Sequence, residues 1–182
     1  MSARSDVVGP TSGPEPPYPL RMEGKVIAGF GRGSKELGIP TANLPVDASL
    51  TPWITDLSSG VYFGYASLAL PDAHPQRPAD IGPAGFALFP MVMSIGYNPF
   101  YKNPVRSAEV HLLHPFTVDF YDAHMRLLIL GFIRPERDYD SLDALIKDIN
   151  LDCDVATKSL DRDAWKLPAA SPAGTDWLVR PM

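Results

Sequence analysis

Cysteine is nearly absent from this chain of 182 residues, in which Cys153 stands alone. A single thiol excludes an internal disulfide framework, and it is typical of proteins from a reducing compartment. It also excludes a zinc site built from several cysteines, and the His, Cys and Asp residues nowhere have the spacing of zinc ligands. We therefore expect no structural zinc.

Long apolar runs and an excess of positive charge are missing as well. No apolar stretch approaches the roughly 18 residues of a membrane span. The chain has 16 Lys and Arg against 21 Asp and Glu, a net charge of −5, and no basic run. This balance argues against nucleic-acid partners and against integral membrane contact.

The N-terminal twenty residues lack the apolar core of a secretory signal and are poor material for a transit peptide. We expect a cytoplasmic protein, with mitochondrial association left open. The length fits one domain. We predict that residues 1–17 form a flexible arm, which packs at most near Tyr18 to Leu20. Residues 18–182 are predicted to form a barrel domain.

Several segments have the alternation and β-branched or aromatic content of strands. A Pro-rich stretch, 71–85, reads as a surface insertion between two of them. Gly64 marks a tight bend within one strand. The predicted strands are Gly24–Ala28, Gly60–Leu70, Phe86–Ile95, Ser107–His114 and Met125–Ile133.

The clearest helical period follows these strands. Apolar residues recur at spacings of three and four from Leu142 to Leu160, and Asp140 or Ser141 can cap the first turn. We predict a helix over about 141–161. After it, 168–175 reads as a loop, and Trp177–Val179 either adds a short strand or docks on the barrel.

A glycine-rich loop follows the first predicted strand, with Gly29, Gly31, Gly33 and Gly38 close together and Lys35 among them. Glycine lets main-chain N–H groups approach phosphate oxygens. Ser34 breaks both the P-loop and the dinucleotide pattern, because each needs Gly there. An ordinary hairpin turn is the alternative.

Thr41 and Asn43 lie two residues apart behind Pro40. In extended backbone both side chains face one side and offer hard oxygen ligands of the kind that Mg²⁺ prefers. Alternatively, both side chains only satisfy a turn.

Glu109 is the candidate for the catalytic group. The pleat of its strand puts Ala108, Val110 and Leu112 on one face and Glu109 and His111 on the other. An alcohol that attacks phosphorus needs a positioned proton acceptor, which a carboxylate can supply. From the residues alone, a solvated Glu on an exposed face remains the alternative.

Five segments follow one another along the chain: GFGRGSKELGIPTAN, SIGYNPFYKN, SAEVHLLHPF, DFYD and GFIRPERDYDSLDALI. In this order they make the chain resemble the riboflavin kinases of the single-function eukaryotic type, over about residues 20–161. The resemblance implies a mainly β fold, a six-stranded antiparallel Greek-key barrel with a C-terminal helix packed against it. It also implies transfer of the γ-phosphate of ATP to the 5′-hydroxyl of riboflavin, which gives FMN and ADP.

The resemblance also implies roles for individual residues. It makes Glu109 the base, Thr41 and Asn43 ligands of Mg²⁺, and the loop before the helix a cover for the flavin ring. The implied ATP-binding residues are Gly29, Gly31, Gly33, Lys35, Leu112, His114 and Tyr121, and the flavin-binding residues are Arg134, Arg137 and Tyr139. Without the resemblance, the RPERDY segment reads as an exposed charged loop.

Two other functions compete with the kinase. One is a catalytically inactive flavin-binding barrel, which would need neither a base nor metal ligands. The other is a barrel that binds single-stranded nucleic acid, which the negative charge disfavours. We expect a monomer that binds riboflavin or FMN and ATP or ADP. The nucleotidyltransferase domain of bacterial two-function proteins is missing, so the product is expected to be FMN and not FAD.

Overall fold

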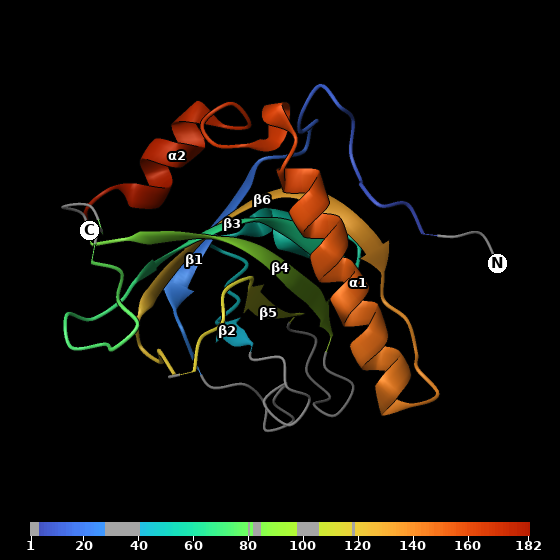
Figure 1. Ribbon diagram of the computed structural model, residues 1–182, viewed down its shortest axis with the longest axis horizontal. Coiled ribbons are helices and arrows are strands. Elements are labelled where there is room, and N and C mark those ends of the chain that lie inside the picture. Colours follow the sequence, from blue (N-terminus) through green and yellow to red (C-terminus); the bar gives the residue numbers. More distant parts are fainter. Residues whose placement is uncertain (1–3, 28–40, 80, 82–84, 98–105, 118) are drawn as a thin grey trace.

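The computed structural model describes residues 4–27, 41–79, 81, 85–97, 106–117 and 119–182. Within these ranges a six-stranded sheet curls around its own core, and two helices lie against its outer surface (Figure 1). The strands are β1 (Leu20–Lys25), β2 (Ala42–Leu44), β3 (Gly60–Ala69), β4 (Ala87–Tyr97), β5 (Arg106–Leu112) and β6 (His124–Pro135).

The strand order is β1-β6-β3-β4-β5-β2, and each neighbouring pair is antiparallel. β3, β4 and β5 follow one another as a meander, and β6 returns to lie beside β3, which is a Greek-key connection. The two edges meet where Ile27 donates a backbone hydrogen bond of 2.8 Å to Asn43. The predicted mainly β, Greek-key fold with a C-terminal helix is therefore confirmed.

The predicted strands agree with the observed ones to within a few residues, except at the start. β1 begins at Leu20, four residues before the predicted Gly24. β2 was not predicted, because three residues are too short to give a periodic signal. The segment between β2 and β3 contains one short 3₁₀ helix, Pro52–Thr55.

Gly64 lies at an irregularity in the pairing of β3 with β6, where the register shifts between Phe63 and Gly64. A Cβ at this position would overlap the carbonyl oxygen of Leu128 on β6. Only glycine lets the two backbones approach this closely. The register shift agrees with a special backbone position at Gly64, and the predicted bend itself stays a prediction.

Two apolar cores lie on opposite faces of the sheet. The core inside the barrel includes Tyr62, Met93, Val110 and Ile129, each almost fully buried. The outer core is formed where the helices cover the sheet, and it contains Val61, Phe63, Val92, Leu128, Leu130, Ala156, Leu160, Trp165 and Leu178. Consequently β3 and most of β6 are buried on both faces.

Helix α1 (Leu142–Leu160) matches the predicted span, and Ser141 is its N-cap, accepting a hydrogen bond of 3.1 Å from the Ala144 N–H. Its C-terminal half buries Ala156 and Leu160 against the sheet, whereas Leu142 near its start is 55% exposed. The first half of α1 therefore leaves room beside the sheet. Within the described ranges, no helix has the length and apolar character needed to cross a membrane.

The C-terminal segment corrects two predictions. Pro172–Val179 forms helix α2, so neither a loop through Thr175 nor a strand at Trp177–Val179 is present. Ser171 caps this helix by accepting a hydrogen bond from the Gly174 N–H, and Pro172 occupies the first turn. Docking on the barrel is confirmed, because Leu178 is fully buried in the outer core.

The N-terminal arm packs more widely than expected. The Val8 N–H donates to the Ser159 hydroxyl at 3.0 Å, and the Trp165 indole donates to the Pro10 carbonyl at 2.8 Å. Arg162 donates to the Val8 carbonyl at 2.5 Å. The prediction that this arm packs at most near Tyr18 to Leu20 is therefore wrong for residues 4–10. Its flexibility remains a prediction.

Candidate active site

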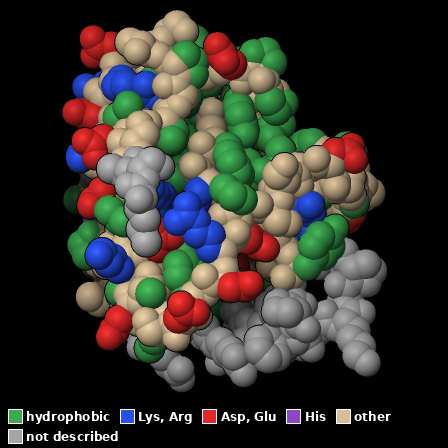
Figure 2. Space-filling view, turned by 90° about the vertical axis from the view of Figure 1, so that its right-hand side faces the viewer, with side chains coloured by type: hydrophobic (Ala, Val, Ile, Leu, Met, Phe, Trp, Pro, Cys, Tyr) green, Lys and Arg blue, Asp and Glu red, His purple; other side chains and the backbone are tan. Residues whose placement is uncertain are grey.

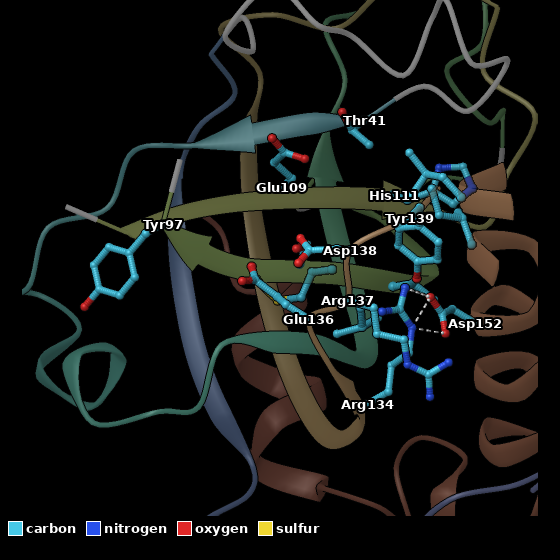
Figure 3. A pocket seen from close by; sticks show the side chains of 16 residues that line it. Thr41, Tyr97, Glu109, His111, Arg134, Glu136, Arg137, Asp138, Tyr139 and Asp152 are labelled. Atoms are coloured by element: carbon cyan, nitrogen blue, oxygen red, sulfur yellow. Dashed lines mark hydrogen bonds and ion pairs between the residues drawn. The ribbon is translucent and has the colours of Figure 1, made fainter. Parts of the chain in front are cut away.

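A pocket of about 640 Å³ lies between the outer face of the sheet and the first half of α1. Its size falls within the range of small-molecule sites. Figure 3 shows Glu109 near Thr41 at one end, and Arg134, Arg137 and Tyr139 grouped at the other. Leu145 and Ile149 of α1 line the pocket, so the half of the helix that leaves the sheet uncovered forms one wall.

Strand β5 aims Glu109 into this pocket. Ala108, Val110 and Leu112 are buried in the barrel core, while Glu109 and His111 line the pocket, which confirms the predicted division of the strand. Burial raises the pKa of the Glu109 carboxyl, and the nearby Glu136 carboxylate raises it further. A higher pKa makes this carboxylate a stronger proton acceptor.

Asn43 pairs with Glu109 across β2 and β5, so the two side chains are neighbours on one face. Asn43 is only 5% exposed, and among the residues that the structure describes its buried Oδ1 atom has no hydrogen-bond partner. Thr41 lines the same pocket. An orphaned amide oxygen and a hydroxyl beside a carboxylate are oxygen donors that fit a hard cation.

A metal site of clustered acids is not found in the described part of the chain. There, no group of three or more His, Cys, Asp or Glu side chains is placed to hold an ion. A cation that takes only one or two oxygens from the protein does not need such a group. Mg²⁺ commonly binds in this way, together with substrate phosphates.

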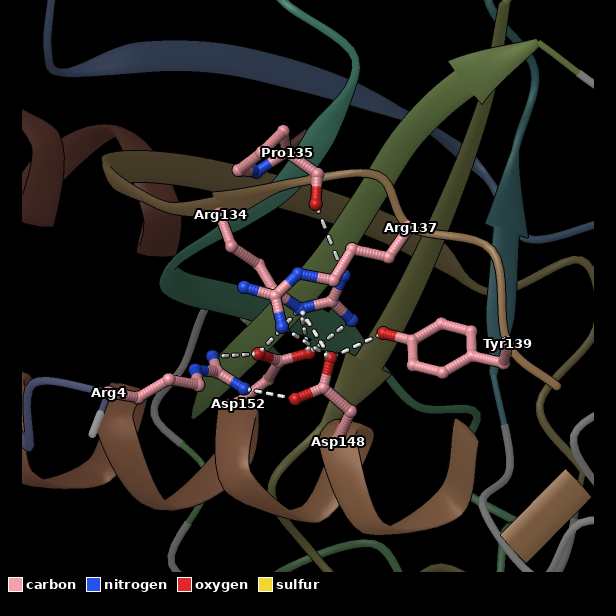
Figure 4. Close-up of polar contacts among 7 residues, drawn as sticks. All are labelled: Arg4, Arg134, Pro135, Arg137, Tyr139, Asp148 and Asp152. Carbon is pink, nitrogen blue, oxygen red and sulfur yellow. Dashed lines mark hydrogen bonds and ion pairs between the residues drawn. The ribbon is translucent and has the colours of Figure 1, made fainter. Parts of the chain in front are cut away.

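Arg134 lies in a buried ionic cluster with helix α1 (Figure 4). Its Nε and Nη2 atoms donate to the Asp152 carboxylate at 3.0 and 2.8 Å, and its Nη1 atom donates to the Pro135 carbonyl at 3.2 Å. Arg134 is 6% exposed and Asp152 is 1% exposed. This pair fixes the end of β6 against the helix.

Asp148 organises the other polar residues at this end of the pocket. Its Oδ2 atom accepts the Tyr139 hydroxyl hydrogen bond and lies 3.7 Å from Nη1 of Arg137. Burial alone would raise the pKa of Asp148, but the Tyr139 hydrogen bond and the charges of Arg134, Arg4 and Arg137 lower it overall. Burial and the Asp148 hydrogen bond raise the pKa of Tyr139 to about 12, so its phenol stays a donor.

Several predicted ATP-binding residues lie away from this pocket. Leu112 packs in the barrel core, and the His114 ring lies 5.0 Å from the Phe89 ring and 4.6 Å from the Phe116 ring. Tyr121 is 49% exposed in a turn. The predicted phosphate-binding residues Gly29, Gly31, Gly33 and Lys35 lie outside the described residues.

Sequence reasoning missed four acidic residues at the site. Glu136 and Asp138 line the pocket, and the Glu136 carboxylate lies against Gly96, where a Cβ would overlap it. Asp148 and Asp152 are buried although both lie on a helix of ordinary amphipathic appearance. Asp148 and Asp152 are four residues apart and lie on the same face of the helix as Leu145 and Ile149. Two acidic residues on an apolar face are the sequence signal that could have identified them.

The whole of this site lies within a region that matches a known family. Residues 16–160 match the family model described as riboflavin kinase. The chain is 70% identical to a riboflavin kinase of Pyricularia oryzae, covering 90% of this chain and 82% of that protein. It is 56% identical to a riboflavin kinase of Chaetomium globosum, covering 95% of this chain and 83% of that protein.

A solved structure has the same fold. The riboflavin kinase from Trypanosoma brucei superposes with a TM-score of 0.62 at 25% identity, covering 81% of this chain and 83% of that one. The family model and both fungal relatives extend over most of the chain. The chain therefore belongs to the riboflavin kinase family.

Proposed function

We propose that the pocket between the sheet and α1 is where this riboflavin kinase transfers the γ-phosphate of ATP to the 5′-hydroxyl of riboflavin, with Glu109 as the base. The support for this reaction is that the chain belongs to the riboflavin kinase family. The observation that carries the residue assignment is the pairing of Glu109 with Asn43, whose buried Oδ1 has no hydrogen-bond partner within the described ranges. It brings a base and a hard oxygen donor side by side.

Glu109 accepts the proton that the 5′-hydroxyl loses as its oxygen attacks the γ-phosphorus. The P–O bond to ADP breaks as the new P–O bond forms, and the proton resides on a carboxylate oxygen of Glu109. The raised pKa of Glu109 supports this assignment, because a stronger base takes the proton more readily. Glu136 holds negative charge nearby and so favours the protonated form.

The metal ion is the second part of the proposal. We assign Mg²⁺ to the oxygen donors Thr41 and Asn43, which fit a hard cation. When bound, Mg²⁺ neutralises charge that develops on the β- and γ-phosphate oxygens. The predicted phosphate-binding residues Gly29, Gly31, Gly33 and Lys35 complete the nucleotide side of this proposal.

The adenine is assigned to the region around His114. This ring, with Phe89 and Phe116, offers flat apolar cover of the kind that a purine needs. Leu112 supports the group from the barrel core, and Tyr121 is exposed enough to contact a ligand.

The flavin ring is assigned to the end of the pocket formed by residues 134–139. Arg137 has a side chain that is 49% exposed, and the Tyr139 phenol is held by Asp148, so both can cover a flat ring. The donors of Arg134 are engaged by Asp152 and Pro135, so its part in flavin binding is to hold this wall in place.

The test is to incubate the full chain with riboflavin, ATP and MgCl₂ and to separate the products by chromatography. FMN and ADP in equal amounts are expected, and none without ATP or with EDTA. Riboflavin that binds but is never phosphorylated would instead support an inactive flavin-binding barrel. Light scattering after gel filtration checks the proposed monomer, and fractionation of cells checks the proposed cytoplasmic location.

A further inference from the structure

We propose that Arg4, on the N-terminal arm, is a positioning residue for riboflavin binding that acts by keeping Arg137 available to the flavin. The inference rests on the proposed function, because it concerns the flavin end of the same pocket. Figure 2 views the side of the molecule that α1 and the arm cover, where Lys and Arg side chains lie beside Asp and Glu.

Asp148 is the centre of the cluster. Its Oδ2 atom lies 3.3 Å from Nε of Arg134 and 3.7 Å from Nη1 of Arg137, and it accepts the Tyr139 hydrogen bond. Three side chains that line the pocket therefore converge on one oxygen of a residue that lies behind the pocket wall. Asp152 also holds Arg134, so the position of Asp148 matters most for Tyr139 and Arg137.

Arg4 bridges the two carboxylates of the acidic pair, and it shares Oδ1 of Asp152 with Nε of Arg134. Its Nη1 atom lies 2.5 Å from Oδ1 of Asp148, and its Nη2 atom donates to Oδ1 of Asp152 (Figure 4). Asp148 and Asp152 are four residues apart on α1, so their carboxylates lie on one face and repel each other. Both are at least nine-tenths buried, and such charges require cationic partners.

The arm is anchored along α1 independently of the pocket. The Val8 N–H donates a hydrogen bond to the Ser159 hydroxyl, and the Trp165 indole donates one to the Pro10 carbonyl. The arm therefore runs in the same direction as the helix. The seven residues from Asp152 to Ser159 rise by about 10 Å as a helix. The four residues from Arg4 to Val8 span about 13 Å when extended. The arm therefore reaches the acidic pair without strain.

The charge balance gives Arg4 its effect on the flavin. With Arg4 present, Arg4 and Arg134 together neutralise the two buried carboxylates. Arg137 then stays loosely held, at 3.7 Å and 49% exposed. Without Arg4, Asp148 and Asp152 face Arg134 alone, and the surplus negative charge draws Arg137 onto Asp148. Arg137 then has to leave a stronger ion pair before it can cover the flavin.

The experiment compares Arg4→Gln with Lys158→Gln in the full chain. Lys158 pairs with Asp6 of the same arm at 3.5 Å, but this pair is exposed and lies outside the cluster. Steady-state rates are measured against riboflavin and against ATP, with thermal melts alongside. Arg4→Gln should raise the KM for riboflavin about fivefold, the upper effect of a partly exposed ion pair. The KM for ATP and kcat should stay within twofold, and Lys158→Gln should match the parent chain.

A double-variant cycle with Asp148→Asn identifies the cause. Arg4→Gln should change nothing further in the Asp148→Asn chain, because the charge that captures Arg137 is gone. The double variant also carries the test if Arg4→Gln alone does not fold. Additive effects would overturn the inference, as would an Arg4→Gln chain that matches Lys158→Gln or loses riboflavin and ATP affinity equally. Failure of the parent chain to make FMN would instead refute the proposed function.

Discussion

Replacing Asn43 by leucine should separate the stability of the protein from its ability to bind metal–nucleotide. Asn43 is 5% exposed, and in the described part of the chain no donor is hydrogen-bonded to its Oδ1 atom. A buried polar atom without a partner costs about 1–3 kcal/mol, and leucine has nearly the same shape without that atom. If Oδ1 is retained for a cation, the free protein bears this cost and the bound protein recovers it.

Asn43→Leu should therefore raise the free energy of unfolding by about 1 kcal/mol over that of the parent chain. This is the lower end of the range, because the substitution also removes the amide nitrogen of Asn43 and any hydrogen bond that it donates. For a chain of this length such a gain raises Tm by about 2–4 °C. The parent chain should gain a further ~2.7 kcal/mol with Mg²⁺–ATP at 100 times its Kd, whereas Asn43→Leu should gain little.

Thermal melts followed by circular dichroism, with and without EDTA, give both quantities for each chain. Asn150→Leu is the matched control, because it makes the same change at an exposed position on α1. Thr41→Val should weaken Mg²⁺–ATP in the same way. Two results would refute the assignment of Asn43 as a retained metal ligand. One is that Mg²⁺–ATP stabilises Asn43→Leu as much as it stabilises the parent chain. The other is that Asn43→Leu has a lower Tm than the parent chain in EDTA.

Three further predictions concern the rest of the molecule. Arg137→Ala should raise the KM for riboflavin by about tenfold and leave that for ATP nearly unchanged; equal changes in both would contradict the flavin assignment. Gly64→Ala should lower the free energy of unfolding by about 2 kcal/mol or more in urea titrations, because the added Cβ overlaps the Leu128 carbonyl. The pKa of Asp148 is lowered in the folded state, so its ion pairs add stability above the unfolded pKa of about 4 that is lost as pH falls through the folded value. Stability of Asp148→Asn should therefore depend less on pH below about 4, and an unchanged dependence would exclude this contribution.

Much of the fold could be predicted because the informative patterns are local. The period of α1 and the alternation of Ala108, Glu109 and Val110 each depend on neighbours in the chain, and both are observed. Helix α2 had a local signal in Ser171 and Pro172. The β-prone residues Trp177 and Val179 favoured the wrong state, which packing against β6 overrides.

The ionic cluster could not be predicted in the same way. Arg4 and Asp148 are 144 residues apart, and nothing in either segment indicates the other. Without a partner in view, Asp148 and Asp152 read as the polar face of a helix. The assignment of Glu109 as the base needed both the local pleat and the family resemblance, and it remains a prediction.

The most direct test of the central claim is the turnover of Glu109→Gln. Single-turnover rates are measured with riboflavin and Mg²⁺–ATP at saturation, beside the parent chain and the exposed control Glu15→Gln. Losing a positioned base should lower the rate of FMN formation by about 10²-fold or more while nucleotide binding and Tm are retained. A folded Glu109→Gln chain that makes FMN as fast as the parent would contradict the assignment of Glu109 as the base.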